Sequence, residues 1–223
     1  GRLSREVETD SPWSGGIRLA VRQAPEGPVE RRLRVPGWCD AASLKVVPAD
    51  SDPAPSPREG EGWGEGMAQQ AVGEYTALRR VWAPGDRVTL RLPMPPRRLV
   101  SDPRVTANVG RVALARGPLI YCVESHDRPG LEQDAFALPD DAAVATGPVD
   151  ERLPGMTLLD MTAVPLPGTP ARGALYQTVS SDGPADGARP DRVAIRAIPY
   201  FAWANRGPST MDVWLRRQDA ISN

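Results

Sequence analysis

The stretch RVALARGPLIYCVESHD, residues 111–127, holds two short apolar runs separated by a Gly-Pro pair. Short apolar runs bounded by turn residues are typical of β-strands. The second run ends in Cys122 and Glu124, and the only histidine of the chain, His126, follows closely. Residues i and i+2 of a strand lie on the same face. The stretch therefore leaves two alternatives: a nucleophile with its acid/base partner, or an ordinary strand that ends in a turn.

The expected geometry favours the ordinary strand. Side by side on one strand, the Cβ atoms of Cys122 and Glu124 would lie about 6.5–7 Å apart, given a rise of ~3.3 Å per residue. The two catalytic groups of a retaining glycosidase lie about 5–5.5 Å apart and converge on the substrate. We therefore expect Glu124 to pair with an arginine or to cap a turn. His126 lies in a polar, turn-like segment, which indicates an exposed histidine rather than a member of a Ser-His-Asp triad.

The composition is that of a globular protein. The 223 residues are 40% hydrophobic and 25% charged, with a net charge of −1 and a pI of about 6.0. This balance argues against a nucleic-acid-binding domain, which would be strongly basic. No apolar run approaches the ~20 residues that span a bilayer. The N-terminal segment lacks the apolar stretch that forms the centre of a signal peptide. From the chain shown we therefore expect a cytoplasmic protein.

Strand-like runs recur along the whole chain, while helical periodicity is scarce. The 25 prolines and 21 glycines separate short alternating runs, which is the pattern of an all-β protein. We predict an all-β fold of two successive antiparallel, jelly-roll-like β-sandwiches, 10–100 and 101–223, with a segment 1–9 that pairs with the second. The runs that support this are GIRLAVRQ (16–23), RRLRVPGW (31–38), SLKVV (43–47), LEQDAFAL (131–138), GMTLLDM (155–161), ALYQTVS (174–180), RVAIRAIPYFAW (192–203) and TMDVWLRR (210–217).

Two further runs, YTALRRVW (75–82) and RVTLRLPMP (87–95), flank the turn sequence APGD. In this turn Pro84 presets φ and Gly85 can adopt a positive φ. The pattern predicts a β-hairpin. By contrast, the segment 48–70 is rich in proline, glycine and acidic residues and predicts a surface loop. Its Trp63 is expected to tuck back onto the fold, with contact to a sugar or a partner as the alternative.

The segment AIPYFAWANRGPSTMDVWL, residues 197–215, gathers four aromatic residues around an Asn-Arg-Gly sequence. We expect Tyr200 and Trp203 to anchor the last strands to the core and Asn205-Arg206-Gly207-Pro208 to form a turn. Arg206 would then pair with a buried carboxylate, with Glu124 as the candidate. A contact between domains, or a sugar platform that includes Phe201 and Trp214, is the alternative.

No other pattern indicates chemistry. Cys39 and Cys122 each lie in a strand-like run and are expected to be buried and free, with a bridge between them as an unsupported alternative. The spacings of zinc ligands and of phosphate-binding loops are absent. The acidic pairs Asp140-Asp141 and Asp150-Glu151 are expected to be solvated. From the residues alone we therefore assign no catalytic, cofactor-binding or metal-binding residue.

Together the runs resemble the C-terminal region of glycoside hydrolase family 127, the β-L-arabinofuranosidase-like enzymes. The matching segments are TDSPWSGGIRLAV (9–21), LRVPGWC (33–39), YTALRRVWAPGDRVTLRLPMPPRRLVSDPRV (75–105), GRVALARGPLIYCVE (110–124) and IPYFAWANRGPSTMDVWL (198–215). They follow the family's order. Two departures are Ser11, where the family often has an aromatic residue, and the long loop after SLKVV, where the family usually has a short Asn-Gly turn.

The resemblance implies that this chain holds the family's middle and C-terminal β-sandwich domains. The catalytic cysteine, the glutamate and the zinc site of such enzymes belong to an (α/α)6 barrel that precedes the matched region. Cys122 would inherit no catalytic role, and no zinc is expected in this chain. The resemblance further implies a retaining hydrolase of plant-type arabinofuranosides as the parent enzyme, with the barrel as partner and a homodimer as an option. The alternative, from another class, is a stand-alone carbohydrate-binding module.

Overall fold

A computed structural model of the chain describes residues 2–50, 75–166 and 191–218. The fold is all-β, and its strands divide between two compact units, Gly1–Pro95 and Pro96–Asn223. The division falls a few residues before the expected one after residue 100. Within the described ranges, no helix has the length and hydropathy to cross a membrane. The predictions for Trp63, for the strand 174–180 and for most of the 48–70 loop lie outside the described residues.

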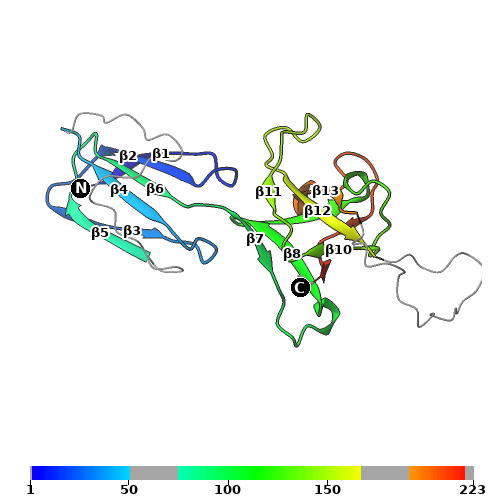
Figure 1. Cartoon of the computed structure of the whole chain (residues 1–223). Helices are drawn as coiled ribbons and strands as arrows, with labels where there is room; N and C mark the ends of the chain where they lie inside the picture. The colour runs from blue at the N-terminus through cyan, green and yellow to red at the C-terminus, as the bar shows by residue number, and fades with distance from the viewer. Residues whose placement is uncertain (1, 51–74, 167–190, 219–223) are drawn as a thin grey trace, which may run out of the picture. The chain divides into compact units, whose positions relative to one another are not determined.

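The first unit consists of two antiparallel sheets that face each other (Figure 1). The larger sheet has the order β1-β2-β6-β4, and the smaller one pairs β3 with β5. The bounds of these strands are β1 Ser4–Thr9, β2 Gly16–Gln23, β3 Pro28–Arg34, β4 Ser43–Val47, β5 Tyr75–Val81 and β6 Arg87–Arg91.

Alternation along the strands builds the core of this unit. In β2, Leu19 and Val21 are buried while Arg18 and Arg22 are exposed. They pack with residues of β4 and β6 and with Trp82, which follows β5. The amphipathic pattern therefore gives a sandwich, as predicted.

Residues 4–9 correct one prediction. They form β1, which pairs with β2 over its whole length, from Ser4 opposite Gln23 to Thr9 opposite Ile17. The segment thus extends the larger sheet of the first unit instead of pairing with the second. β1 is an edge strand and mostly exposed, so the sequence lacked the buried alternation that would have indicated its partner.

The predicted hairpin of residues 75–95 is also wrong, although both strands exist. β5 pairs with β3, and β6 pairs with β2 and β4. The turn between them has Pro84 second and Gly85 third, at a φ of 95°, and Asp86 N–H donates to the Ala83 carbonyl at 3.1 Å. This is a type II turn, whereas two-residue hairpins favour the primed types I′ and II′. The turn therefore leads the chain from one sheet to the other.

The second unit is a sandwich in which hydrogen-bonded strand pairs connect one layer to the other at both edges. Its strand order is β14-β9-β13-β12-β10-β15-β8-β7, and β9 also pairs with β8, so the six strands from β9 to β8 form a closed ring. Most pairs are antiparallel, and β10 with β15 is parallel. The bounds are β7 Pro96–Leu99, β8 Arg111–Arg116, β9 Leu119–Glu124, β10 Phe136–Pro139, β11 Ala145–Thr146, β12 Leu159–Pro165, β13 Val193–Pro199, β14 Met211–Asp212 and β15 Leu215–Gln218, with the short 3-10 helices η1 Thr106–Asn108, η2 Ser125–Asp127 and η3 Tyr200–Ala202.

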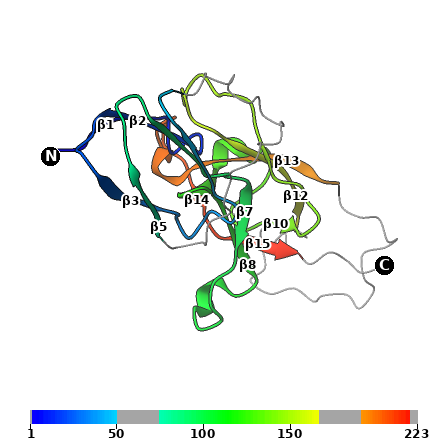
Figure 2. The same cartoon turned by 90° about the vertical axis from the view of Figure 1, so that its left-hand side faces the viewer.

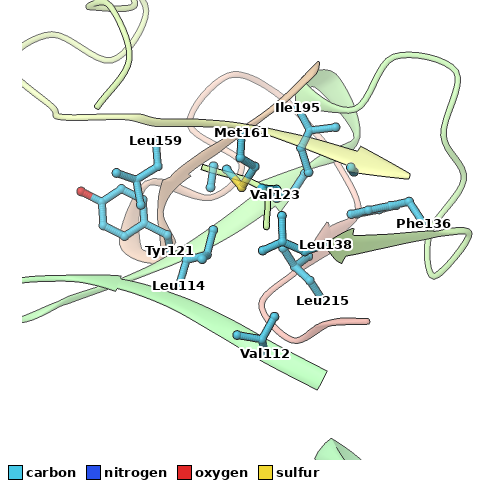
Figure 3. Close-up of a cluster of buried hydrophobic side chains, with 13 residues drawn as sticks. Val112, Leu114, Tyr121, Val123, Phe136, Leu138, Leu159, Met161, Ile195 and Leu215 are labelled. Carbon is cyan, nitrogen blue, oxygen red and sulfur yellow. The ribbon is translucent and has the colours of Figure 1, made fainter. Parts of the chain in front are cut away.

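The core of the second unit fills this ring. Figure 2 shows strands β10, β12, β13 and β15 gathered together. Figure 3 shows the side chains of the main cluster pointing toward one another. All are buried: Val112, Leu114, Tyr121, Val123, Phe136, Leu138, Leu159, Met161, Ile195 and Leu215. The Tyr121 hydroxyl reaches the edge of the cluster and donates to the Thr157 carbonyl at 2.9 Å, so the core contains no unpaired phenol.

The opening stretch forms the hairpin of β8 and β9. Arg116 pairs with Leu119, so the loop has two residues, Gly117 and Pro118. Gly117 has a φ of 54°, as the first central position of a type II′ turn requires. The hairpin places Tyr121 and Val123 in the core and directs the alternate residues of β9 to its other face.

Candidate functional site

Cys122 and Glu124 share the face of β9 that points away from the main core. Both are buried, with exposed fractions of 1% and 0%. Cys122 packs in a second apolar cluster with Leu153, Leu158 and Ile198. Burial, together with the nearby charge of Glu124, raises the pKa of the Cys122 thiol to about 12. The thiol is therefore protonated at neutral pH, and a protonated thiol is neither a good nucleophile nor a metal ligand. The geometry favours the structural interpretation of this strand.

Glu124 is paired with Arg206, which confirms the expected partner. Both side chains are fully enclosed. Arg206 Nε donates to Glu124 Oε2 at 3.1 Å, and Arg206 Nη2 donates to the same oxygen. The other oxygen, Oε1, accepts from the Ala204 N–H at 2.8 Å and from the Ser209 hydroxyl at 2.6 Å. Four hydrogen-bond donors of the protein therefore replace the water that would solvate this carboxylate. They compensate for the cost of burying its charge.

Two further carboxylates surround the same guanidinium. Arg206 Nη1 donates to Asp127 Oδ1 at 3.0 Å and to Asp150 Oδ2 at 3.3 Å, and Nη2 donates to Asp127 Oδ2. Asp150 also accepts from Arg152 Nη2 at 3.0 Å. The Asp150 side chain is only 9% exposed, so the prediction that Asp150 is solvated was wrong. The arginine lies 56 residues further along the chain, and no local pattern indicated the contact.

The electrostatics keep this cluster charged. Burial by itself raises the pKa of Glu124, but hydrogen bonds from Ser209, Ala204 and Arg206 outweigh it and hold that pKa below its ordinary value. The hydrogen bond from Arg152 lowers the pKa of Asp150 to about 2. The pKa of Arg206 is raised, first by its hydrogen bond to Asp127. Each oxygen of Glu124 is already engaged, so Glu124 is not placed to transfer a proton to a substrate.

The residues that precede Arg206 form an exposed aromatic turn, which we define as Tyr200, Phe201 and Trp203. Their exposed fractions are 45%, 56% and 42%, whereas the intervening Ala202 is fully buried. Trp203 Nε1 donates to the Ser209 carbonyl at 3.2 Å. The prediction that Tyr200 and Trp203 anchor the core is therefore wrong. The chain forms the 3-10 turn η3 here instead of continuing the strand, and within this turn only Ala202 is buried.

The remaining predicted residues are not among the groups that form the hydrogen bonds of this cluster. His126 lies in η2 and is exposed, as expected. Cys39 and Cys122 are both buried. Among the described residues, no three His, Cys, Asp or Glu side chains are grouped so as to hold a metal ion. Cys122 in particular does not fit a zinc site, because its neighbours are apolar and the adjacent carboxylate of Glu124 is engaged by four donors.

Two family models match the chain, one after the other. The model of the glycoside hydrolase family 127 middle domain, described as β-L-arabinofuranosidase, matches residues 1–94. The model of the family 127 C-terminal domain matches residues 96–216. The junction between them coincides with the division of the strands into two units.

Known proteins show the same relationship over the same region. The chain is similar to a non-reducing end β-L-arabinofuranosidase of Bifidobacterium longum, with 30% identity over 96% of this chain and 30% of that protein. A crystal structure of a GH127 β-L-arabinofuranosidase from Geobacillus stearothermophilus T6 aligns with a TM-score of 0.72 and 34% identity, over 97% of this chain and 31% of that one. A further structure, of a glycoside hydrolase, aligns with a TM-score of 0.76 and 29% identity, over 97% and 32% of the two chains. The chain thus spans about a third of the length of these relatives.

Proposed function

Because this chain belongs to glycoside hydrolase family 127 and holds its middle and C-terminal domains, we propose that it is the accessory β-sandwich region of a β-L-arabinofuranosidase. The observation that carries the proposal is the succession of the two family models along the chain, with about a third of the length of each relative matched. In this role the two sandwiches pack against the catalytic barrel and shape one side of its mouth. The chain itself performs no hydrolysis.

The parent reaction is the retaining hydrolysis of a terminal β-L-arabinofuranoside. We assign its nucleophile, its acid/base and its zinc to an (α/α)6 barrel outside this chain. The only cysteine that lies next to a glutamate here, Cys122, has a pKa raised by burial, and zinc ligation requires a thiolate. Plant-type arabinofuranosides as substrates and a homodimer as the assembled form belong to the same proposal for the parent enzyme.

The native size of the polypeptide tests the accessory role. An antibody against this chain, used to blot an extract of the source cells, should reveal a band of about three times 24.0 kDa, because the chain spans about 30% of its relative. A single band near 24.0 kDa would contradict the proposal, since the sandwiches would then stand alone.

Activity of the pure chain provides the second test. The 223-residue chain should show no turnover of an aryl β-L-arabinofuranoside. Turnover that disappears in Cys122→Ser and survives in the matched variant Cys39→Ser, which changes the other buried cysteine, would show a catalytic thiol in this chain and overturn the proposal.

The aromatic turn supports a second candidate, a stand-alone carbohydrate-binding module. Tyr200, Phe201 and Trp203 are all substantially exposed, and exposed aromatic rings can stack on sugars. The accessory role instead has this surface covered in the parent enzyme. The module is favoured if arabino-oligosaccharides quench the tryptophan fluorescence and if this quenching is lost in Trp203→Ala. The accessory role is favoured if the isolated chain self-associates or binds an apolar dye and if this behaviour is lost in the same variant.

A further inference from the structure

The first unit holds a buried arginine whose charge is not paired. Arg31 of β3 is only 7% exposed and lies on the face of the strand that carries Val29 and Leu33 to the core. Its Nε is fully enclosed and has no hydrogen-bond partner. Nη1 and Nη2 are not fully enclosed, and among the described residues Arg31 forms neither a hydrogen bond nor an ion pair. Buried arginines are almost always paired, so this guanidinium lacks an anion.

A neighbouring arginine shows how such a charge is ordinarily balanced. Arg80 of β5 and Arg31 both stack on the indole of Trp82, with their guanidinium carbons 5.2 and 5.4 Å from the ring centroid. The ring attracts a cation but accepts none of the hydrogen bonds that a guanidinium directs in its own plane. Arg80 Nη2 also lies 3.5 Å from the carboxylate of Asp86, which is buried. The charge of Arg80 is therefore balanced within the chain, whereas that of Arg31 is not.

A second cation lies close to Arg31. Arg5 of β1 is opposite Val21 in the strand pairing, and Val21 belongs to the core between the two sheets. Paired residues of neighbouring strands share a face of the sheet, so Arg5 faces the side on which β3 lies. Burial lowers the pKa of Arg31, and the charge of Arg5 lowers it further. Arg5 itself is exposed, so a ligand that meets both cations has access from solvent.

We propose that Arg31 and Arg5 bind an oxyanion, a carboxylate or a phosphate. The two terminal nitrogens of a guanidinium form a planar fork that matches two oxygens of such a group. In Arg31 these are the two nitrogens that are not fully enclosed. A neutral hydroxyl could accept a hydrogen bond here, but it would leave the buried charge uncompensated. The inference goes beyond the accessory role, because the site lies wholly within the first unit.

Stability measurements on the full 223-residue chain test the site. A ligand that binds only the folded state raises the urea midpoint with a saturable dependence on its concentration. We would add phosphate or acetate at constant ionic strength, balanced with chloride, and follow the first unit by hydrogen exchange of peptides from β2. We expect a saturable rise of the midpoint. The NMR signal of the Trp82 indole N–H should shift over the same range of concentration.

Four variants separate the site from a general effect of salt. Arg31→Met should abolish the response and, without added anion, leave the midpoint unchanged or raised, because it replaces an uncompensated buried charge with an apolar side chain. Arg80→Met should lower the midpoint, since it leaves the buried Asp86 without its cation. Arg5→Gln, an exposed change, should weaken anion binding several-fold. The matched control Arg32→Met changes the exposed face of the same strand and should leave the response unchanged.

Three outcomes overturn the inference. Neither anion gives a saturable rise, or the rise survives unchanged in Arg31→Met or in Arg5→Gln, or Arg31→Met lowers the anion-free midpoint as much as Arg80→Met. In the parent enzyme, a retained response to phosphate identifies a free anion as the ligand, whereas a lost response and a destabilising Arg31→Met identify a carboxylate of the parent's own chain. None of these outcomes alters the expected size of the native polypeptide, so failure of this inference and failure of the accessory role are distinguishable.

Discussion

Replacing Arg206 with methionine removes the one cation that Glu124, Asp127 and Asp150 share. Its side chain and that of Glu124 are fully enclosed, and the two aspartates are 8% and 9% exposed. Removing one partner of a buried ion pair costs about 3–5 kcal/mol, because the other charge stays buried without compensation. Here Glu124 keeps only the neutral donors Ala204 N–H and Ser209 Oγ–H. We therefore expect a loss at the upper end of that range.

The ranking of variants is more specific than any single value. Glu124→Gln leaves Arg206 bound to Asp127 and Asp150, and the amide oxygen can still accept from Ala204. The loss is then that of a hydrogen bond to a charged group, about 1.5–3 kcal/mol. The matched control is Arg104→Met, because Arg104 also binds a carboxylate, that of Asp102, through two hydrogen bonds, at 2.9 and 3.0 Å, but on an exposed surface. That variant should be indistinguishable from the unmodified chain.

Urea denaturation followed by circular dichroism gives the free energies of unfolding. Hydrogen exchange with mass spectrometry assigns them to a unit, by comparing peptides from β9 of the second unit with peptides from β2 of the first. We expect Arg206→Met to lower the protection of β9 and to leave that of β2 unchanged. If Arg206→Met is no more destabilising than Arg104→Met, the cluster contributes nothing beyond a surface ion pair, and the reasoning is refuted.

Three further results are expected. Gly15→Ala should destabilise the first unit severely, because an added Cβ would lie 1.7 Å from the Leu92 carbonyl oxygen, whereas Gly16→Ala, whose nearest contact is at 3.6 Å, should be tolerated; comparison of their urea midpoints checks this. Cys122 should resist thiol labelling in the native chain up to alkaline pH and react only on unfolding, since its pKa is raised to about 12; rapid native labelling would contradict the burial. The pKa of Asp150 is about 2 against an ordinary 3.8. Its stabilising contribution is therefore present above pH 3.8 and is lost as the pH falls through 2. The free energy of unfolding of the second unit, measured as a function of pH, should therefore fall less steeply in acid in Asp150→Asn.

Strand identity could be predicted from the sequence wherever one face of a strand is buried. The run 16–23 alternates cleanly and forms β2 with those bounds. Strand pairing was predicted less well, because it depends on turn geometry. Turn geometry in turn depends on the order of the glycine and the proline, and not only on their presence. The order Gly117-Pro118 gives a hairpin, while the order Pro84-Gly85 gives a crossing between sheets, although both pairs are turn sequences. The difference follows from which central position has the positive φ.

The candidate site could be predicted only where local geometry determined it. That Cys122 and Glu124 share a face follows from the two-residue period of a strand, and the pairing of Glu124 with Arg206 follows from the need of a buried carboxylate for a cation. Asp150 could not be found in this way, because its contact with Arg206 depends on the path of a long connection.

Arg206 and its three carboxylates, Glu124, Asp127 and Asp150, form one structural unit with the aromatic turn. This arrangement explains why Glu124 is buried here. Ala204 has a φ of 64°, a left-handed conformation that costs a non-glycine residue about 1–2 kcal/mol. Its N–H donates to Glu124, and the same carboxylate binds Arg206 two residues later. Glu124 therefore holds the backbone in the conformation that leaves Tyr200, Phe201 and Trp203 exposed. If the turn is a docking surface, Glu124→Gln should weaken docking through the backbone even though the carboxylate touches no partner, and Ala204→Gly should partly restore stability by relieving the strain.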